Sequence, residues 1–504
     1  MSKVTEKRLS ATDPGAGSPT LLRQLGVISA TALVVSNMVG TGIFTTTGFL
    51  AGDLGDPGLV LSIWLAGALF ALAGAFCYSE LGINLPSSGG EYVYLTRAYG
   101  PTWGFMSGWV SFFAGFSAPI AAAALAFSYY LGHFFPGWLR ALAESSLLAD
   151  LPFSRLWEQI FLALERFFRA INQDGAVWTL GSGTFALKLG GAQVVACGLI
   201  AVFTVLNFLG VSRVAKIQNV LTATKLLVIL AFITLGFLAG TGNWENFSLA
   251  ATRTSTVPVA AQFAISLFWI YVCYSGWNAA TYVAEELKRP ERTLPIALLF
   301  GTALVAMLYV ALNLVFIFAS PLESMKGVVA VGSLAAKHLF GPETAGIFSA
   351  LMALSLMATV NAMVTIGPRV YYAMAKNGAF FRKAAEVHPR WRTPVFAIAC
   401  QGLCAMLMTL TPFPTLMIYI GFTLTSMTVL SVSSLFIFRR RPEWQKLRVV
   451  SIAFPLIPVF FILVGLWTIV YGVWLQPKIS VAVVTTLATG ALVYHFRFRP
   501  QRSR

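Results

Sequence analysis

Two short runs of small and polar residues interrupt long apolar stretches, and their backbone atoms could bind a charged ligand. In the first run, residues 37–44, Gly40 and Gly42 flank Thr41, and the second run, residues 271–278, contains Ser275 and Gly276. Glycine weakens a helix, and broken backbone at membrane depth is tolerated only where it lines a cavity or binds something. The freed N–H groups and the positive end of a following half-helix suit a carboxylate. Small-residue packing between helices is the alternative explanation of the first run taken alone.

The positions of the two runs within the chain favour the first explanation. They fall in apolar segments that we expect to be the first and the sixth membrane-spanning helices. If the first and sixth helices are equivalent members of two five-helix repeats, the two repeats cross the membrane in opposite orientations, because five is an odd number of spans. Paired broken helices in corresponding positions predict an inverted-repeat transporter with a binding site near the bilayer midplane.

Three charged residues lie within or at the ends of apolar segments. Lys225 lies inside residues 217–240, where it either extends to the membrane interface or forms an intramembrane ammonium that replaces a bound cation or carries a proton. Glu80 ends an apolar stretch, and Arg369 comes late in another. These two residues either belong to an internal gate or mark the cytoplasmic interface.

The residue types argue against an enzyme, a metal site or a cofactor. The four histidines are His133, His338, His388 and His495. All of them lie near the ends of apolar segments or in loops, and none forms a helical His-x-x-x-His or His-Glu-x-x-His pair. We therefore expect neither catalysis nor a bound metal ion.

The composition indicates a membrane protein rather than a soluble or nucleic-acid-binding one. The chain has 504 residues, of which 57% are hydrophobic and 11% are charged, whereas a soluble domain carries about 25% charged residues. The net charge of +16 comes from basic residues clustered in short loops, which is the orientation signal of an inner or plasma membrane protein. No structural disulfide is expected, because all five cysteines fall in apolar runs. They are Cys77, Cys197, Cys273, Cys400 and Cys404.

We expect an all-α membrane protein with twelve transmembrane helices. The predicted spans are 25–50, 57–84, 101–134, 188–210, 217–240, 259–286, 293–319, 343–375, 393–411, 413–438, 451–473 and 479–497. Twelve spans place both termini on the same side of the membrane, and most lysines and arginines fall on that side. Both termini are therefore predicted to be cytoplasmic. Residues 1–24 are predicted to be disordered. The long loop 135–187 is predicted to be external, with an amphipathic helix on the membrane surface or over the outer mouth, unless it is only a spacer.

Four stretches of the chain resemble the amino acid–polyamine–organocation superfamily, and within it the L-type amino acid transporters and their bacterial relatives. The first is Gly-Thr-Gly-Ile-Phe at 40–44. The second and most specific is Gly-Ala-Phe-Cys-Tyr-Ser-Glu-Leu-Gly at 74–82 with Pro-Ser-Ser-Gly-Gly-Glu-Tyr-Val-Tyr at 86–94. The third is Tyr-Ser-Gly-Trp-Asn at 274–278 with Glu-Glu at 285–286 and Pro-Glu-Arg-Thr-Leu-Pro at 290–295. The fourth runs from Arg-Val-Tyr-Tyr at 369–372 through Gly378 and His388 to Thr-Pro at 393–394.

The resemblance implies a fold and a binding site. The fold would have two inverted five-helix repeats of the LeuT type, residues 25–240 and 241–438, and two extra helices in residues 439–504. The carboxylate of an amino acid would be held by the backbone N–H groups of Thr41, Gly42 and Ile43. Its ammonium group would meet backbone carbonyls of both broken helices, at Met38, Val272, Cys273 and Ser275. Selectivity would depend on the pocket near Val272, Tyr271, Ala122, Ala123 and Asn278.

The resemblance also bears on ion coupling, on gating and on partners. Lys225 matches a lysine that, in sodium-independent members of the family, occupies the place of a sodium ion. In this chain Lys225 would bridge helices 5, 1 and 8. Many L-type members have an aromatic external gate where this chain has Val272, so Tyr271, Phe268 or Trp269 would have to replace it, or the pocket would be roomier. Residues 135–187 contain no cysteine for a disulfide-linked heavy chain, and none is expected.

The leading hypothesis is a sodium-independent secondary transporter of neutral L-amino acids that works by alternating access, by exchange or with protons. Helices 1, 2, 6 and 7 would rock against helices 3, 4, 8 and 9. A carrier of cationic amino acids or amines is the alternative; it would need an intramembrane acid or a cluster of carbonyls and aromatics, and Glu80 lies near the cytoplasmic side. A nutrient receptor that binds without transporting would share the same pocket.

Overall fold

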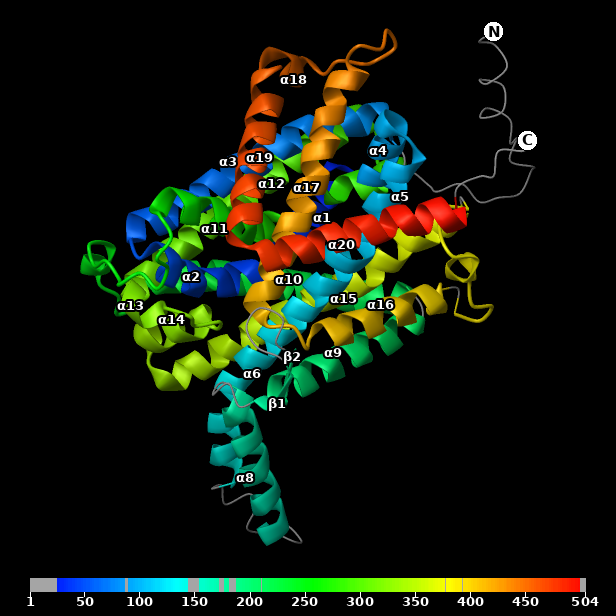
Figure 1. Ribbon diagram of the computed structural model, residues 1–504. Helices are drawn as coiled ribbons and strands as arrows, with labels where there is room; N and C mark the ends of the chain where they lie inside the picture. The colour runs from blue at the N-terminus through cyan, green and yellow to red at the C-terminus, as the bar shows by residue number, and fades with distance from the viewer. Residues whose placement is uncertain are drawn as a thin grey trace.

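The computed structural model describes residues 25–86, 89–143, 154–171, 176–180, 187–209, 211–376, 378–391 and 393–498. Within these ranges the chain is almost entirely helical, and its two strands, β1 (Ala176–Leu180) and β2 (Leu187–Gly190), pair antiparallel. The helices pack around a continuous apolar core (Figure 1). The prediction of an all-α, multi-span membrane protein is confirmed, whereas the prediction for residues 1–24 lies outside the described residues.

Eleven helices in the described ranges are long and apolar enough to cross a membrane. They are Val27–Leu54, Pro57–Asn84, Pro101–Pro136, Gly191–Phe208, Val220–Leu238, Val259–Ala284, Pro290–Ala319, Thr344–Lys376, Phe413–Phe438, Leu456–Leu475 and Pro477–Phe498. The predicted ninth span contains the apolar helix α16 (Val395–Met408), which is shorter than these eleven. The number of twelve spans therefore stays a prediction.

The first and sixth spans are both interrupted. In the first, α1 (Val27–Met38) and α2 (Thr41–Leu54) are separated by Val39 and Gly40. In the sixth, α11 (Val259–Tyr274) is followed by residues 275–278 and then by the 3₁₀ helix η5 (Ala279–Glu286). A backbone bridge between Leu25 and Leu287 joins the start of the first segment to the end of the sixth.

The turn between α2 and α3 (Pro57–Asn84) follows from its local sequence. α2 ends at Leu54 and is followed by Gly55, whose positive φ of 70° is accessible to glycine at little cost. The side chain of Asp56 accepts a hydrogen bond from the Leu59 N–H at 2.8 Å and so caps α3. Pro57 begins the helix, where its missing N–H costs nothing.

The third span is a long continuous rod. It consists of α5 (Pro101–Val110), the π-helix η2 (Ser111–Ser117) and α6 (Ala118–Ala143). Beyond the helical body, α8 (Ser154–Ile171) packs against α6, and the two helices project outward together (Figure 1). A helix is therefore present within residues 135–187 as predicted, but it projects from the body, and its predicted position on the membrane surface or over the outer mouth stays a prediction. Its exposed apolar side chains are Leu156, Ile160, Leu164 and Phe167.

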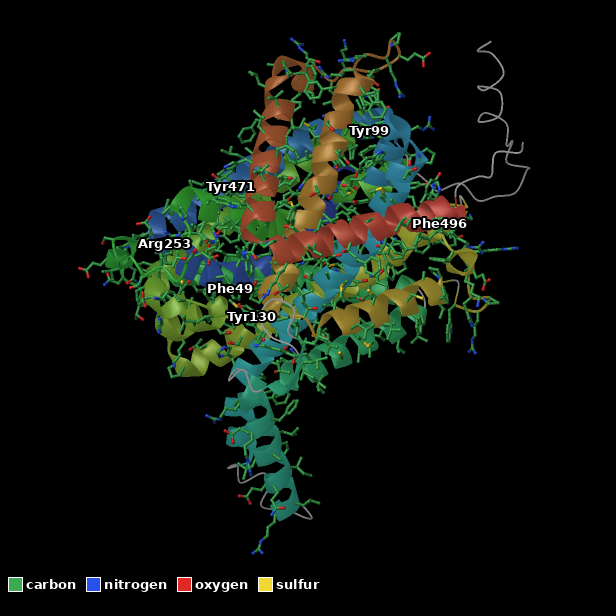
Figure 2. All side chains as sticks on the ribbon, viewed as in Figure 1. Phe49, Tyr99, Tyr130, Arg253, Tyr471 and Phe496 are labelled. Atoms are coloured by element: carbon green, nitrogen blue, oxygen red, sulfur yellow. The ribbon has the colours of Figure 1, made fainter. Side chains whose placement is uncertain are left out.

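The remaining helices complete the body. α3 packs against α12 (Pro290–Ala319), and α6 packs against α15 (Pro342–Lys376). The others are α4 (Glu91–Tyr99), α9 (Gly191–Phe208), α10 (Val211–Leu238), η4 (Trp244–Phe247), α13 (Leu322–Met325), α14 (Val331–Phe340), η6 (Arg382–Ala385), α17 (Phe413–Phe438), α18 (Arg448–Ile452), α19 (Leu456–Leu475), α20 (Pro477–Val493) and η7 (Tyr494–Phe498). Arg253, beside the end of α2, and Tyr99, the last residue of α4, lie far apart on the molecule (Figure 2).

Candidate functional site

The break in the first span leaves backbone groups without helical partners. Gly40 has non-helical dihedral angles (φ −130°, ψ −149°), and α2 begins at Thr41 directly after it. The first N–H groups of a helix have no carbonyl four residues earlier, so those of Thr41, Gly42 and Ile43 have no partner within α2. The positive end of the α2 dipole also lies at this point, which favours a negatively charged group.

The break in the sixth span lies against the break in the first. Ser275 is extended (ψ 145°), and Gly276 adopts a positive φ of 100°. A Cβ atom on Gly276 would lie 2.8 Å from the carbonyl carbon and oxygen of Asn37, and one on Gly42 would lie 2.4 Å from the Cys273 Sγ atom. The two half-helices therefore approach as closely as glycine alone permits.

A narrow cavity lies between the two breaks. Six residues of the predicted pocket line it: Met38, Thr41, Gly42, Ala122, Val272 and Ser275. About 20 Å³ within it is open to the centres of water molecules, which is room for about one water. Side chains must therefore move apart before a whole amino acid fits. None of the described residues that line the cavity carries a formal charge.

Several predicted contact residues do not line this cavity. Ile43 is fully buried, and the Cys273 Sγ atom contacts Thr46 Oγ1 at 3.2 Å. The Asn278 side chain turns away and donates a hydrogen bond to Glu91 at 2.5 Å. Ala123 is fully buried outside the cavity lining.

The aromatic residues that were predicted to replace an external gate also point elsewhere. The Tyr271 hydroxyl bonds to Thr428 Oγ1 of α17 at 2.7 Å. Trp269 stacks on Phe49, and the Phe268 ring stacks on Phe422 with a centroid distance of 4.9 Å. In this conformation none of the three candidate aromatic residues covers the cavity.

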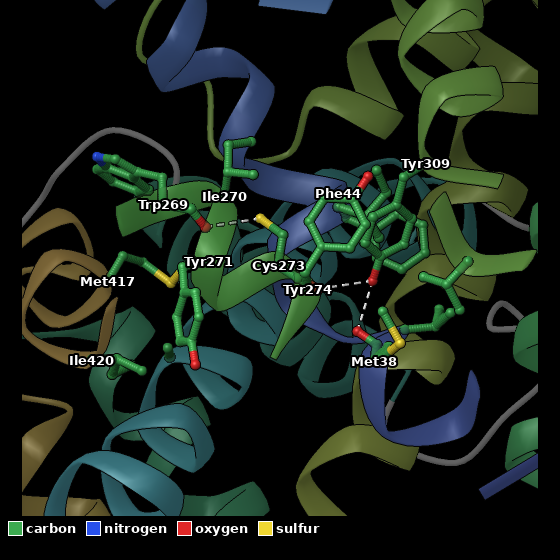
Figure 3. Close-up of a cluster of buried hydrophobic side chains, with 14 of the residues drawn as sticks. Met38, Phe44, Trp269, Ile270, Tyr271, Cys273, Tyr274, Tyr309, Met417 and Ile420 are labelled. Atoms are coloured by element: carbon green, nitrogen blue, oxygen red, sulfur yellow. Dashed lines mark hydrogen bonds between the residues drawn. The ribbon is translucent and has the colours of Figure 1, made fainter. Parts of the chain in front are cut away.

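Tyr309 of α12 links the carbonyls that were predicted to bind an ammonium group. Its hydroxyl oxygen lies 2.6 Å from the Met38 carbonyl oxygen and 3.0 Å from that of Cys273 (Figure 3). A phenolic hydroxyl has a single proton, so it can donate fully to one carbonyl at a time. Each carbonyl has two lone pairs, and both therefore retain capacity for a further donor.

Lys225 of α10 is bonded to the broken end of α1. The residue is 1% exposed, and its Nζ atom donates to the carbonyl oxygen of Ser36 at 2.9 Å and to that of Val39 at 2.5 Å. These are terminal carbonyls of α1, where the helix dipole is negative and a cation is favoured. The predicted contact with helix 1 is thus present. For the described residues, no hydrogen bond joins Lys225 to α15.

The connection from α10 to α15 runs through neighbouring side chains instead. Ser36 and Thr222 share a hydrogen bond of 3.1 Å, and Gln218 donates to Thr222 at 3.2 Å. Asn361 of α15 then donates to Gln218 at 2.8 Å. Helices 1, 5 and 8 are therefore joined by a chain of neutral polar groups beside Lys225.

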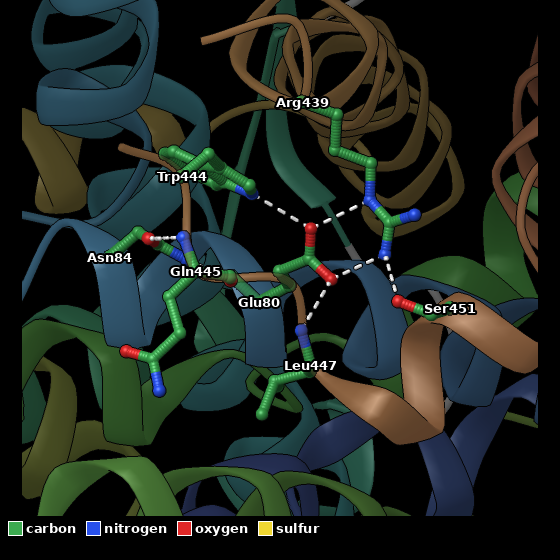
Figure 4. A network of polar contacts seen from close by, with 7 residues as sticks. All are labelled: Glu80, Asn84, Arg439, Trp444, Gln445, Leu447 and Ser451. Carbon is green, nitrogen blue, oxygen red and sulfur yellow. Dashed lines mark hydrogen bonds and ion pairs between the residues drawn. The ribbon is translucent and has the colours of Figure 1, made fainter. Parts of the chain in front are cut away.

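Glu80 and Arg369 do not form a common network. Glu80 is fully buried, and its carboxylate accepts two hydrogen bonds from Arg439, at 2.7 and 2.5 Å (Figure 4). It also accepts from the Trp444 indole at 2.8 Å and from the Leu447 N–H at 3.1 Å. Arg369, by contrast, is exposed. The structure thus pairs Glu80 with an arginine that the sequence analysis did not identify.

Comparison with known proteins identifies the family. The sequence model described as "Amino acid permease" matches residues 25–493. The chain belongs to the amino acid permease family. This result confirms the family membership that the four sequence stretches predicted.

Individual relatives are similar over nearly the whole chain. The mouse large neutral amino acids transporter small subunit 2 is 26% identical over 497 residues, which cover 95% of this chain and 82% of the relative. The serine/threonine exchanger SteT of Bacillus subtilis (strain 168) is 28% identical over 451 residues, 88% of this chain and 89% of the relative. The mouse b(0,+)-type amino acid transporter 1 is 24% identical over 487 residues, 95% of this chain and 88% of the relative.

The permease cavity also includes residues that the sequence analysis missed. They are Pro119, Thr359, Met363, Met417 and Ile420, whereas Asn37 and Gly40, which also line the cavity, belong to the interrupted run 37–44. Most of these are apolar residues of regular helices, so nothing local marks them as cavity residues. Thr359 and Tyr309 are polar residues in apolar helices, which is a signal that could have identified them. Within the described part of the chain, the buried Thr359 Oγ1 atom has no hydrogen-bond partner.

Proposed function

We propose that this permease is a sodium-independent transporter of neutral L-amino acids that works by alternating access. The observation that carries the proposal is the pair of facing helix breaks with a cavity between them. Backbone N–H groups at the start of α2 suit a carboxylate, and carbonyls at Met38 and Ser275 suit an ammonium group. Together they match a zwitterion without any charged side chain.

The lining of the cavity supports neutral rather than cationic substrates. Val272, Met363, Met417 and Ile420 offer apolar surface, and no acidic side chain of the described residues faces a substrate. A cationic side chain would lose its hydration there without gaining a partner. The unpartnered Thr359 hydroxyl supplies a hydrogen bond to a polar substrate atom.

The position of Lys225 supports sodium independence. Its ammonium bonds to two carbonyl oxygens of the broken first helix, which are the kind of ligands that an alkali cation would use. A second cation in the same place would be repelled by the ammonium. Transport would then be driven by exchange of amino acids or by protons.

The proposal extends to topology and partners. Both termini would be cytoplasmic in a plasma or inner membrane, because the basic residues of the short loops would then lie on the inner side. The bundle, defined as α1, α2, α3, α11, η5 and α12, would rock against the frame, defined as α5, α6, α9, α15 and α16. No disulfide-linked partner is required, because residues 135–187 contain no cysteine.

The test is uptake of radiolabelled amino acids by proteoliposomes, with and without internal amino acid, external sodium and a proton gradient. We expect uptake of neutral amino acids that ignores sodium and is stimulated by internal amino acid or by the proton gradient. Sodium-dependent uptake would overturn the role given to Lys225. Uptake of lysine or amines alone would support the cationic alternative, and binding without flux would support a receptor.

A further inference from the structure

Thr359 of α15 has a buried hydroxyl group without a partner. The residue is 4% exposed, and its Oγ1 atom makes no hydrogen bond to any described residue. Two other threonines of the same helix donate to the carbonyl one turn earlier. Thr344 donates to Phe340 at 3.0 Å, and Thr365 donates to Asn361 at 2.7 Å. A helix therefore offers a threonine hydroxyl a partner in its own backbone, and Thr359 does not use it.

The unpartnered hydroxyl lies at the cavity between the two helix breaks. Of the described residues that bury a side-chain polar atom without a partner, Thr359 is the one that lines this cavity. A Cβ atom on Gly40 would lie 3.4 Å from Thr359 Cγ2 and 3.8 Å from its Oγ1 atom. The hydroxyl is therefore close to the break in the first span. An unpaired buried hydroxyl is unfavourable, and a ligand that bonds to it removes this penalty.

The cavity has a polar part and a largely apolar part. Backbone groups of the two breaks form the polar part, where the proposed function places the carboxylate and the ammonium group of an amino acid. The substrate side chain must then face the rest of the lining, in which Thr359 has the only polar side chain among the described residues. This part consists of Pro119 and Ala122 of α6, Thr359 and Met363 of α15, and Met417 and Ile420 of α17.

We propose that the Thr359 hydroxyl binds a hydroxyl group on the β-carbon of the substrate, so that this permease selects serine and threonine among the neutral amino acids. The proposal rests on the transport function proposed above and names its substrate class. The breaks hold the α-carbon of the substrate beside Gly40, which is also where Thr359 Oγ1 lies. A polar atom attached to the β-carbon is close enough to meet it. Two hydroxyl groups can bond in either direction, because each both donates and accepts.

Other neutral side chains fit this part of the cavity less well. A longer polar side chain would carry its amide or hydroxyl past Thr359 to Met363, Met417 and Ile420, where it loses hydration without gaining a partner. Alanine and valine would leave the Thr359 hydroxyl unpaired. A site that bonds to a substrate hydroxyl discriminates against the analogue that lacks it. The narrow cavity also favours small substrates, because they require the least movement of its walls.

The test uses two pairs of amino acids that differ at one hydroxyl group: serine with alanine, and threonine with the nearly isosteric valine. Initial uptake of each labelled amino acid by proteoliposomes, at concentrations well below saturation, is the measurement. We expect the parent to prefer the hydroxyl-bearing member of each pair by about fivefold, which is the effect of one hydrogen bond between neutral groups.

Thr359→Val keeps the shape of the side chain and removes its hydroxyl. We expect this variant to transport alanine and valine and to lose the preference for serine and threonine. Thr359→Ser retains a hydroxyl and should retain the preference. Thr344→Val is the matched control on the same helix. It removes a hydroxyl that is bonded to Phe340 and lies outside the cavity lining, so it should select substrates as the parent does.

Thermal unfolding of the substrate-free protein gives a second measurement that does not depend on transport. Because Thr359→Val removes an unpaired buried hydroxyl, its unfolding midpoint should equal or exceed that of the parent. A lower midpoint would show that the hydroxyl is already satisfied without substrate, and this would overturn the proposal.

Equal uptake of both members of each pair by the parent would also overturn it. So would an equal loss of all four amino acids in Thr359→Val, because the hydroxyl would then contact the carboxylate or ammonium group that they share. In both cases the proposed transport function would stand. Absence of uptake of every neutral amino acid would overturn that function, and the role of Thr359 would fall with it.

Discussion

At the scale of single residues, Lys225 and Tyr309 satisfy backbone atoms that the helix breaks expose. A helix that ends inside a membrane leaves carbonyls without partners, and an unpaired buried polar group is costly. Lys225 donates to Ser36 and Val39, and Tyr309 bonds to Met38 and Cys273. Two long side chains from neighbouring helices thus hold the broken end of α1 in place. The backbone N–H groups at the start of α2 remain without a partner in that helix.

Replacement of Lys225 by alanine should therefore impair both stability and transport. The carbonyls of Ser36 and Val39 would lose their donor in a buried place, at a cost of about 1–3 kcal/mol for each carbonyl. Thermal unfolding of the purified protein and exchange in proteoliposomes are the measurements. Leu227→Ala, on the same helix with a 67% exposed side chain, is the control and should retain both. Full activity of Lys225→Ala would contradict this role.

At the scale of elements, the site depends on how closely two half-helices approach. Gly42 at the start of α2 lies against the backbone of Cys273 near the end of α11. The contact sets the distance between the N–H groups of one helix and the carbonyls of the other. A change in this distance would alter the fit of a zwitterion to both sets of backbone groups at once.

Gly42→Ala should abolish or strongly reduce transport. The new Cβ atom would lie 2.4 Å from the Cys273 Sγ atom and 2.7 Å from its Cα atom, so backbone must shift. Overpacking of this kind costs about 1–3 kcal/mol. Substrate affinity and uptake are the measurements. Gly198→Ala on α9 is the matched control, because a Cβ atom there meets nothing within 4 Å. Equal uptake by the two variants would show that the close approach is not required.

At the scale of the whole molecule, Glu80 connects the bundle to the segment after α17. Its carboxylate on α3 bonds to Arg439, Trp444 and Leu447, and Arg439 also donates to Ser451 at the start of the eleventh predicted span. The Arg439 guanidinium lies 4.1 Å from the centroid of the Phe454 ring. One buried acid thus holds the last helices against the rest of the fold.

Glu80→Gln should destabilise the whole protein. It leaves the largely buried Arg439 charge unpaired, and breaking a buried ion pair in this way costs about 3–5 kcal/mol. The thermal unfolding midpoint of the detergent-solubilised protein is the measurement. Glu323→Gln, which removes an exposed ion pair with Lys326, is the comparison and should change the midpoint little. A midpoint for Glu80→Gln as high as that of the parent would mean that the network adds no stability.

The sequence by itself determined which segments are apolar enough to span a membrane and where two of them are interrupted. It could do so because hydropathy and glycine content act locally along the chain. The interruptions at Gly40 and Gly276 and the amphipathic helix within 135–187 occur where they were predicted. The four sequence stretches likewise led to the family that the comparison identified.

Tertiary structure alone decided which side chains meet. Glu80 pairs with Arg439, which no sequence pattern indicated, and Asn278 bonds to Glu91 instead of lining the cavity. Met417 and Ile420 line the cavity from α17, whereas Tyr271, one of the residues that could have replaced an aromatic gate, does not line it. Such contacts join residues that are more than a hundred positions apart. They depend on how helices pack and rotate against one another, which no local pattern of residues specifies.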